Sequence, residues 1–160
     1  MALTQAHIKS SYPLPAYNYR VTVLDGVTPA VIGFSEVSGV GMECQPVIYK
    51  HGFSFATGPV LIPGMVQTHR LTLKKGLTGN GDFLQKWIEQ ACADPYSAGV
   101  KRDVVVDLCD EVGLPMIRWM LLGALPVKLD APTFSAGSNE VAIASMELVA
   151  GDLKVNYQLF

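Results

Sequence analysis

Three segments of this chain alternate apolar and polar residues with a period of two. In residues 17–24 tyrosines and valines occupy the odd-numbered positions, and mostly polar residues occupy the even-numbered ones. Residues 69–74 and 102–109 repeat the pattern. Because successive side chains of a β-strand point to opposite faces, this alternation predicts half-buried strands. The chain is therefore constrained to bury one face of at least one sheet.

Further segments predict strands with a less regular pattern. Residues 116–122 are apolar on both parities apart from Arg118, which is typical of a strand covered on both faces. Residues 139–149 are also apolar on both parities, and shorter strands are expected at residues 30–34 and 43–50. Prolines and glycines separate these segments, as expected for turns between short strands.

One segment, residues 82–93, predicts an α-helix. Its apolar residues recur at helical spacing, with Asp82 as the N-cap and Asp94-Pro95 as the stop signal. The apolar residues of this stripe are Phe83, Leu84, Trp87, Ile88 and Ala91. We expect the stripe to pack on a sheet.

These elements predict a mainly β (α+β) fold. About seven strands and one helix favour two packed antiparallel sheets that form a β-sandwich or partly open barrel, with the helix on one flank. No repeat or linker divides residues 1–160, so we expect a single domain. Trp87 and Trp119 are expected in its core, as is Leu73.

Composition narrows the class of function. Hydrophobic residues make up 49% of the chain and charged residues 16%, below the roughly 25% of typical soluble domains. A chain with so few charged residues is expected to have an apolar surface, which favours burial against other copies of the chain. The net charge is -2 and no basic tract occurs, so neither sequence-specific nucleic-acid binding nor binding to anionic lipid is favoured.

The sequence also predicts where the protein is made. Its beginning lacks the apolar core of a signal peptide, so synthesis in the cytoplasm is expected. The longest apolar stretch, residues 116–127, is shorter than the roughly 20 residues of a membrane helix. We expect it to be a buried strand and predict no membrane span.

No set of residues predicts catalysis, a metal site or a cofactor. His7, His51 and His69 are isolated from one another, and no HExxH, GxSxG or phosphate-binding loop occurs. The chain is therefore predicted not to be an enzyme.

Two smaller groups of residues have ordinary interpretations. A carboxylate cluster lies near a turn, without the spacing of a calcium loop, and is interpreted as a solvated hairpin turn. Its members are Asp107, Asp110 and Glu111. The three cysteines, Cys44, Cys92 and Cys109, are widely spaced and are expected to be reduced and buried.

Residues 51–65, HGFSFATGPVLIPGM, do not fit the pattern of an ordinary surface loop. Large apolar residues are interleaved with two prolines and three glycines. Because loops normally face water, such a segment predicts a protein interface. The residues expected to contact another subunit are His51, Phe53, Phe55, Val60, Leu61 and Ile62.

A set of motifs that runs in order along nearly the whole chain resembles the tail tube proteins of T4-like phages. The same motifs are similar to the inner tube proteins of extracellular contractile injection systems. The motifs are YNYRVTV at residues 17–23, GFSEVSGV at 33–40, IPG at 62–64, LTLKKGLTG at 71–79, FLQKWI at 83–88, and WMLLGALPVKLDAPTFSAGSNEVAIASMELVAGDL at 119–153.

The resemblance implies a tail-tube or Hcp-like fold and a structural role without cofactors. Six copies would close into a ring around a lumen, and rings would stack through residues 51–65 into a tube. A contractile sheath would surround the tube. Baseplate and initiator proteins would lie at one end and a terminator at the other, with cargo or a tape-measure protein in the lumen. Such a particle can be released extracellularly, and residues 1–13 would be a flexible or inter-subunit arm.

Polar strand faces are expected to line the lumen of such a tube. Strand alternation gives Arg20, Thr22, Arg70, Thr72 and Lys74 as candidates, although parity alone does not distinguish the lumen from the outer wall. Two other classes of function stay open. A small-ligand-binding β-barrel would need a roomy interior, and a flavin-using split-barrel enzyme would need a phosphate-binding loop that the sequence lacks.

Overall fold

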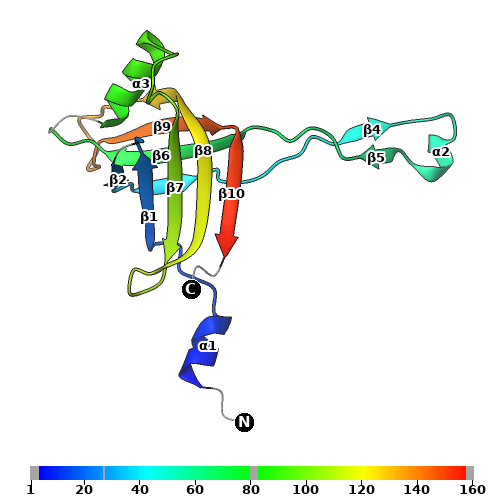
Figure 1. The fold of residues 1–160 in the computed structure, drawn as a ribbon, viewed down its shortest axis with the longest axis horizontal. Helices are drawn as coiled ribbons and strands as arrows, with labels where there is room; N and C mark the ends of the chain where they lie inside the picture. Colours follow the sequence, from blue (N-terminus) through cyan, green and yellow to red (C-terminus); the bar gives the residue numbers. More distant parts are fainter. Residues whose placement is uncertain (1–3, 27, 80–82, 158–160) are drawn as a thin grey trace.

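A computed structural model describes residues 4–26, 28–79 and 83–157 (Figure 1). These residues form a two-layered β-sandwich from which a long arm and a short N-terminal helix project. The first layer, called the β1 layer, contains β1 (Tyr19–Leu24), β2 (Pro29–Ile32), β7 (Arg102–Cys109) and β10 (Asp152–Tyr157). The second, the β6 layer, contains β3 (Glu36–Ser38), β6 (His69–Gly76) and β9 (Ile143–Ala150).

The long strand β8 (Pro115–Asp130) belongs to both layers. Its first part pairs with β7 and β10, and its last residues pair with β9, always antiparallel. The strands of the two layers consequently run across one another (Figure 1). Near the crossing, Gly123 has a φ of +63°, and its N–H donates to Asp103 Oδ1 at 2.9 Å. Such irregular positions bend a strand, which allows β8 to pass from one layer to the other.

The space between the layers is filled by apolar side chains. Leu71 and Leu73 from the β6 layer, and Val21 and Val104 from the β1 layer, are almost completely buried. The helix α3 (Phe83–Ala93) packs against β8 and buries Leu84, Trp87 and Ala91. The Trp87 indole N–H donates to the carbonyl of Val100 at 2.7 Å, so this buried polar group is satisfied.

The predicted fold class, the helix and the strand phases at residues 17–24 and 69–74 are confirmed. The predicted N-cap of the helix, Asp82, lies outside the described residues. Leu73 is fully buried, as expected, whereas Trp119 packs on the core but is only half-buried. The sequence did not predict β3, β5 or β10, nor either of the shorter helices.

Several strand predictions need correction. Residues 102–109 were expected to be buried on one face, but Val105 and Cys109 on the opposite face are buried as well. The reverse holds for residues 116–122, expected to be covered on both faces, where Leu121 is buried and its neighbours are half-buried. The observed β9 begins at Ile143 and buries alternate side chains. Of residues 43–50, three form a strand.

The arm, residues 39–68, leaves the body between β3 and β6 (Figure 1). It is a hairpin in which β4 (Val47–Tyr49) pairs antiparallel with β5 (Val60–Ile62). The short helix α2 (Ser54–Thr57) forms its tip. Residues 51–65 are therefore not an irregular loop, because the second half of a hairpin lies within them.

The N-terminal helix α1 (Gln5–Ser11) projects from the opposite end of the body to α3 (Figure 1). The Thr4 hydroxyl oxygen accepts a hydrogen bond from the His7 N–H at its N-terminus, and none of its side chains is buried. The part of the chain that the structure describes contains no helix long and apolar enough to cross a bilayer.

Candidate interaction surfaces

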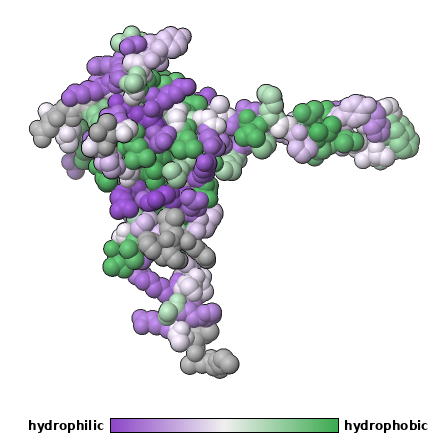
Figure 2. Space-filling model, viewed as in Figure 1, coloured by the Kyte–Doolittle hydropathy of each residue, from purple (hydrophilic) through white to green (hydrophobic). Residues whose placement is uncertain are grey.

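The arm exposes large apolar side chains along its whole length. Phe55 is 86% exposed, Leu61 67% and Phe53 58%. Figure 2 shows hydrophobic residues from the root of the arm to its tip. The structure thus brings the six predicted contact residues together on one element, and each of them is exposed.

The arm exposes further apolar residues that were not predicted as contacts. They are Met42, Val47, Ile48, Tyr49, Met65 and Val66. The sequence contained a signal, because residues 43–50 have the apolar content of a strand. That signal was interpreted only as a short strand, and no described part of the chain covers its side chains.

His51 shapes the turn of the hairpin. Its Nδ1 accepts a hydrogen bond from the Phe53 N–H at 3.1 Å, and its own N–H donates to Ser54 Oγ at 2.9 Å. Phe53 and Phe55 then lie edge to face, with ring centroids 5.4 Å apart. The tip of the arm is consequently an ordered aromatic pair.

The two sides of the arm approach one another closely at Gly64. A Cβ at this position would lie 1.9 Å from the backbone oxygen of Gln45, so only glycine fits. Next to it, the N–H of Gln45 donates to the carbonyl of Met65 at 2.9 Å, and the Gln67 amide donates to the Gln45 side chain. This ladder of hydrogen bonds holds the arm as one unit.

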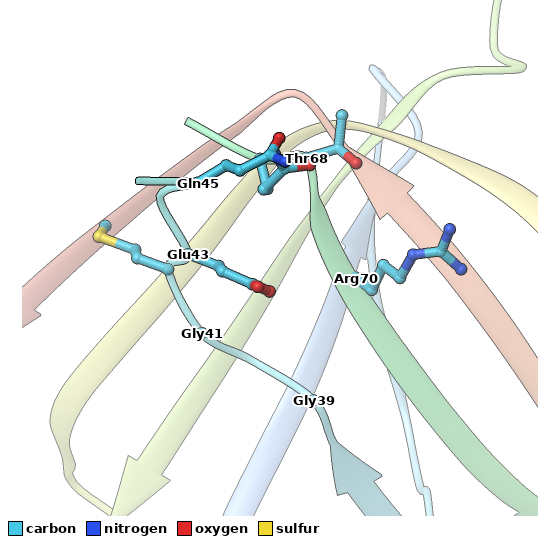
Figure 3. Close-up of a pocket in the computed structure, with 8 residues that line it drawn as sticks. Gly39, Gly41, Glu43, Gln45, Thr68 and Arg70 are labelled. Carbon is cyan, nitrogen blue, oxygen red and sulfur yellow. The ribbon is translucent and has the colours of Figure 1, made fainter. Parts of the chain in front are cut away.

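A polar hollow of about 540 Å³ lies at the root of the arm (Figure 3). Glu43 and Gln45 from one side of the root, and Thr68 and Arg70 from the other, contribute to its lining. Charged and amide groups dominate this hollow, and Met42 is the one large apolar side chain in its lining.

A second hollow, of about 380 Å³, lies between strands of the β1 layer and the residues of β3. We call it the Trp119 groove. Trp119 and Tyr19 of the β1 layer line one side of it. Val37 of β3 and Val40, at the start of the arm, also contribute to the lining. The Tyr19 hydroxyl donates to the carbonyl of Phe34 at 2.7 Å, and burial raises the pKa of its phenol.

The outer face of the β6 layer is polar and its charges are paired. Arg70 contacts Glu147 at 2.6 Å, and Lys74 contacts Glu36 at 3.2 Å. Thr72 lies between the two cations on β6. Exposed ion pairs of this kind contribute little to stability, and here they leave a charged but balanced surface.

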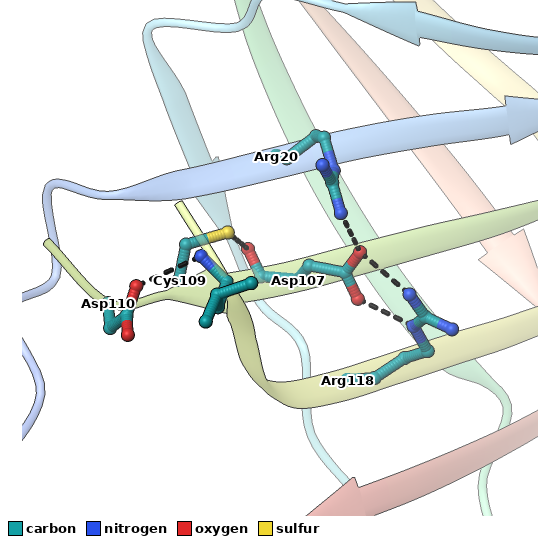
Figure 4. A network of polar contacts seen from close by, with 6 residues as sticks. Arg20, Asp107, Cys109, Asp110 and Arg118 are labelled. Atoms are coloured by element: carbon teal, nitrogen blue, oxygen red, sulfur yellow. Dashed lines mark hydrogen bonds and ion pairs between the residues drawn. The ribbon is translucent and has the colours of Figure 1, made fainter. Parts of the chain in front are cut away.

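The outer face of the β1 layer contains a different arrangement, in which one buried carboxylate joins three strands (Figure 4). The Asp107 side chain is 2% exposed, and Arg20 of β1 and Arg118 of β8 both donate to it. Hydrogen bonding to Asp107 raises the pKa of the Arg118 guanidinium. The prediction that Asp107 belongs to a solvated turn is therefore wrong.

The other two members of that cluster do lie in the turn between β7 and β8. Asp110 Oδ1 accepts hydrogen bonds from the N–H groups of Val112 and Leu114, both at 2.9 Å. Glu111 is exposed and pairs with Lys9 of α1 at 2.7 Å, which raises the pKa of that lysine. The turn is thus shaped by Asp110, and Glu111 connects it to the N-terminal helix.

The five polar residues predicted to face a lumen fall on two opposite surfaces. Arg20 and Thr22 lie on the outer face of the β1 layer, and Arg70, Thr72 and Lys74 lie on the outer face of the β6 layer. The structure therefore does not bring the five residues together.

Two of the three cysteine predictions are wrong. Cys109 is buried, and its burial raises the pKa of the thiol, but Cys44 on the arm and Cys92 on α3 are exposed. Cys92 follows Ala91, the last buried position of the helix, and so lies beyond the face that packs on the sheet. Within the described ranges, no group of three or more His, Cys, Asp or Glu side chains is arranged to hold a metal ion.

One protein family matches most of this chain. Residues 15–154 match the profile of the family described as T4-like virus tail tube protein gp19. A chain in the cryo-EM structure of an extracellular contractile injection system, the PVC sheath-tube complex in the extended state, is 26% identical with a TM-score of 0.81. The match covers 98% of this chain and 99% of that one.

Two structures of the anti-feeding prophage are also similar. A chain of its tube terminating cap is 28% identical with a TM-score of 0.78, covering 92% of this chain and 93% of that one. A chain of its baseplate is 24% identical with a TM-score of 0.82, covering 94% and 99%, and this likeness concerns the fold alone. A comparison with curated proteins gives no match.

Proposed function

This chain belongs to the family of T4-like virus tail tube proteins, and we propose that it is the inner tube subunit of a contractile injection particle. The family is structural and not enzymatic. Six copies form a ring, and rings stack into a hollow tube that the contracting sheath drives through a target envelope. The tube conducts cargo and has no catalytic role.

The observation that carries this proposal is the uncovered arm. A two-stranded hairpin is marginally stable alone in water, and its large apolar residues, such as Phe55 and Leu61, lie in the open. Exposed apolar surface of this extent marks a protein interface. In a tube the neighbouring copies cover the arm, and contact between different surfaces of identical chains extends along the axis as a filament.

Ring closure is assigned to the β1 layer. Its edge strands β2 and β10 are unpaired on their outer sides within the described chain. The edge strands of the β6 layer are less suited to pairing with another chain. At one edge, β3 is only three residues long. At the other edge, β8 contains Pro126 and packs against α3 (Figure 1). Joining the β1 layers of successive copies removes both open edges and gives a closed barrel.

This closure gives the two polar faces different roles. The outer face of the β1 layer, with Arg20 and Thr22, lines the lumen and contacts cargo or a tape-measure protein. The face with Arg70, Thr72 and Lys74 turns toward the sheath. Thr22→Cys and Thr72→Cys, each in a Cys44→Ser, Cys92→Ser background, test the assignment. A large maleimide polymer should modify position 72 in assembled tubes but position 22 only after dissociation, and the reverse would overturn it.

Partners at the tube ends follow from the same proposal. Similar chains occur in sheath-tube and terminating-cap assemblies. We assign a sheath outside this tube, baseplate and initiator proteins at one end, and a terminator at the other. The particle is assembled in the cytoplasm and released. Residues 1–13, which include α1, serve as an inter-subunit arm.

Electron microscopy of the purified protein tests the proposal directly. A tube subunit gives rings or rods of uniform width. A small-ligand-binding barrel, the alternative class, gives featureless small particles. The buried side chains that fill the space between the layers favour the tube.

A further inference from the structure

The Trp119 groove differs in chemistry from the other hollows described on the surface. Its lining is aromatic and aliphatic, with Leu14, Tyr19, Val37 and Trp119 among its residues, and includes no charged side chain. Each of the other three hollows contains charged groups. Such a lining offers few hydrogen-bonding groups to water, so the groove is suited to binding an apolar side chain.

The tip of the arm has the matching chemistry. Phe53 and Phe55 form an edge-to-face pair at its end, and both are largely exposed. In residues 47–65, Lys50 is the one side chain with a full charge. Aromatic side chains that fill an apolar pocket dominate the affinity of many protein interfaces.

We propose that the Trp119 groove of one copy receives the aromatic tip of the arm of a neighbouring copy. This assignment rests on the proposed tube function and names the receptor for the arm. The arm of the same chain does not fill the groove, because it extends away from the body (Figure 1). Tip and groove are different surfaces of identical chains, so their contact repeats from copy to copy without closing on itself.

The two tryptophans make the contact measurable. Trp87 is fully buried and hydrogen-bonded, so its fluorescence is protected in every assembly state. Trp119 is half-buried and lines the groove, so a quencher such as acrylamide reaches it in unassembled protein. We expect quenching of the wild type to fall severalfold when tubes form. A Trp119→Phe variant should show low and unchanged quenching in both states.

Disulfide cross-linking identifies the occupant. Ala56→Cys places a thiol beside Phe55 at the tip, and Ser38→Cys places one at the rim of the groove, both at exposed positions. The two variants, in a Cys44→Ser, Cys92→Ser background, are mixed, assembled and oxidised. We expect a covalent dimer that contains one copy of each variant. Tyr96→Cys, on an exposed residue away from the groove, replaces Ser38→Cys as the control and should give none.

The outcomes separate this inference from the proposed function. Tubes that form without protection of Trp119 and without the 56–38 disulfide would overturn the groove assignment and leave the tube function intact. Absence of tubes from the wild type would count against the tube function itself. Protection of Trp119 together with a disulfide formed as strongly in the Tyr96→Cys control would overturn the assignment, because the tip would then lie elsewhere.

Discussion

Arg118 holds the buried carboxylate of Asp107 with two hydrogen bonds, from Nε to Oδ1 at 2.7 Å and from Nη2 to Oδ2 at 3.1 Å. A second guanidinium, that of Arg20, reaches the same carboxylate at 3.2 Å. The three side chains come from adjacent strands and tie β1, β7 and β8 together.

Replacing Arg118 with methionine should destabilise the fold. A buried ion that loses its partner typically costs 3–5 kcal/mol, and because Arg20 remains we expect about 2–3 kcal/mol. Arg70→Met, which breaks an exposed pair with Glu147, is the matched control and should cost at most about 1 kcal/mol. Urea unfolding of both variants measures the difference. Equal losses would show that the Asp107 cluster contributes no more than a surface pair.

Tyr19 should make stability depend on alkaline pH. Burial raises the pKa of its phenol, and the Glu36 carboxylate adds to the effect. In the unfolded state this phenol has a pKa of about 10. Above that pH the unfolded chain has lost the proton, whereas the folded chain still holds it. Stability is complete below that pH and falls as the pH rises through the folded pKa.

Tyr19→Phe tests this expectation. It should flatten the alkaline decrease in the free energy of unfolding, and it should cost about 1 kcal/mol at neutral pH from the lost hydrogen bond to Phe34. Urea titrations from neutral pH to about pH 11 compare the two proteins. Parallel curves for wild type and variant would contradict the assignment to Tyr19.

Gly64→Ala should damage the arm and leave the body intact. The added methyl group would collide with the backbone of Gln45, which cannot move aside as a flexible side chain does. Gly52→Ala is the control, because a Cβ there meets nothing within 4 Å. We expect unchanged melting for both variants and reduced tube formation for Gly64→Ala alone. Normal tubes from Gly64→Ala would mean that the close approach at the arm is dispensable.

The sequence predicted the body better than the surfaces. The alternation of apolar and polar residues correctly predicted the buried face of β6, because Leu71 and Leu73 are buried on the same face of the strand. It did not reveal the burial of Asp107, because Arg20 lies 87 residues away and joins it only through strand pairing. β10 was missed because its apolar pattern is short, with Leu153 and Val155 as its two residues in contact with the core.

The arm was predicted in part, for a physical reason. Apolar residues such as Phe55 and Leu61 indicated an interface. The pattern of apolar residues in a sequence, however, does not distinguish a segment buried in the core of its own chain from one buried against a partner. The hairpin leaves the body between β3 and β6, and no local pattern of the sequence encodes that departure. The same limit applies to the Trp119 groove, which combines residues from distant parts of the sequence.

The most direct test of the account is to separate folding from assembly at the tip of the arm. Phe55→Asp places a charge at an exposed position. We therefore expect its free energy of unfolding to lie within about 0.5 kcal/mol of the wild-type value. Phe55→Leu, which keeps the position apolar, is the control. Electron micrographs and sedimentation should show rods for wild type and Phe55→Leu, and only rings or monomers for Phe55→Asp. Normal rods from Phe55→Asp, or its unfolding, would contradict the claim that the arm joins folded subunits into a tube.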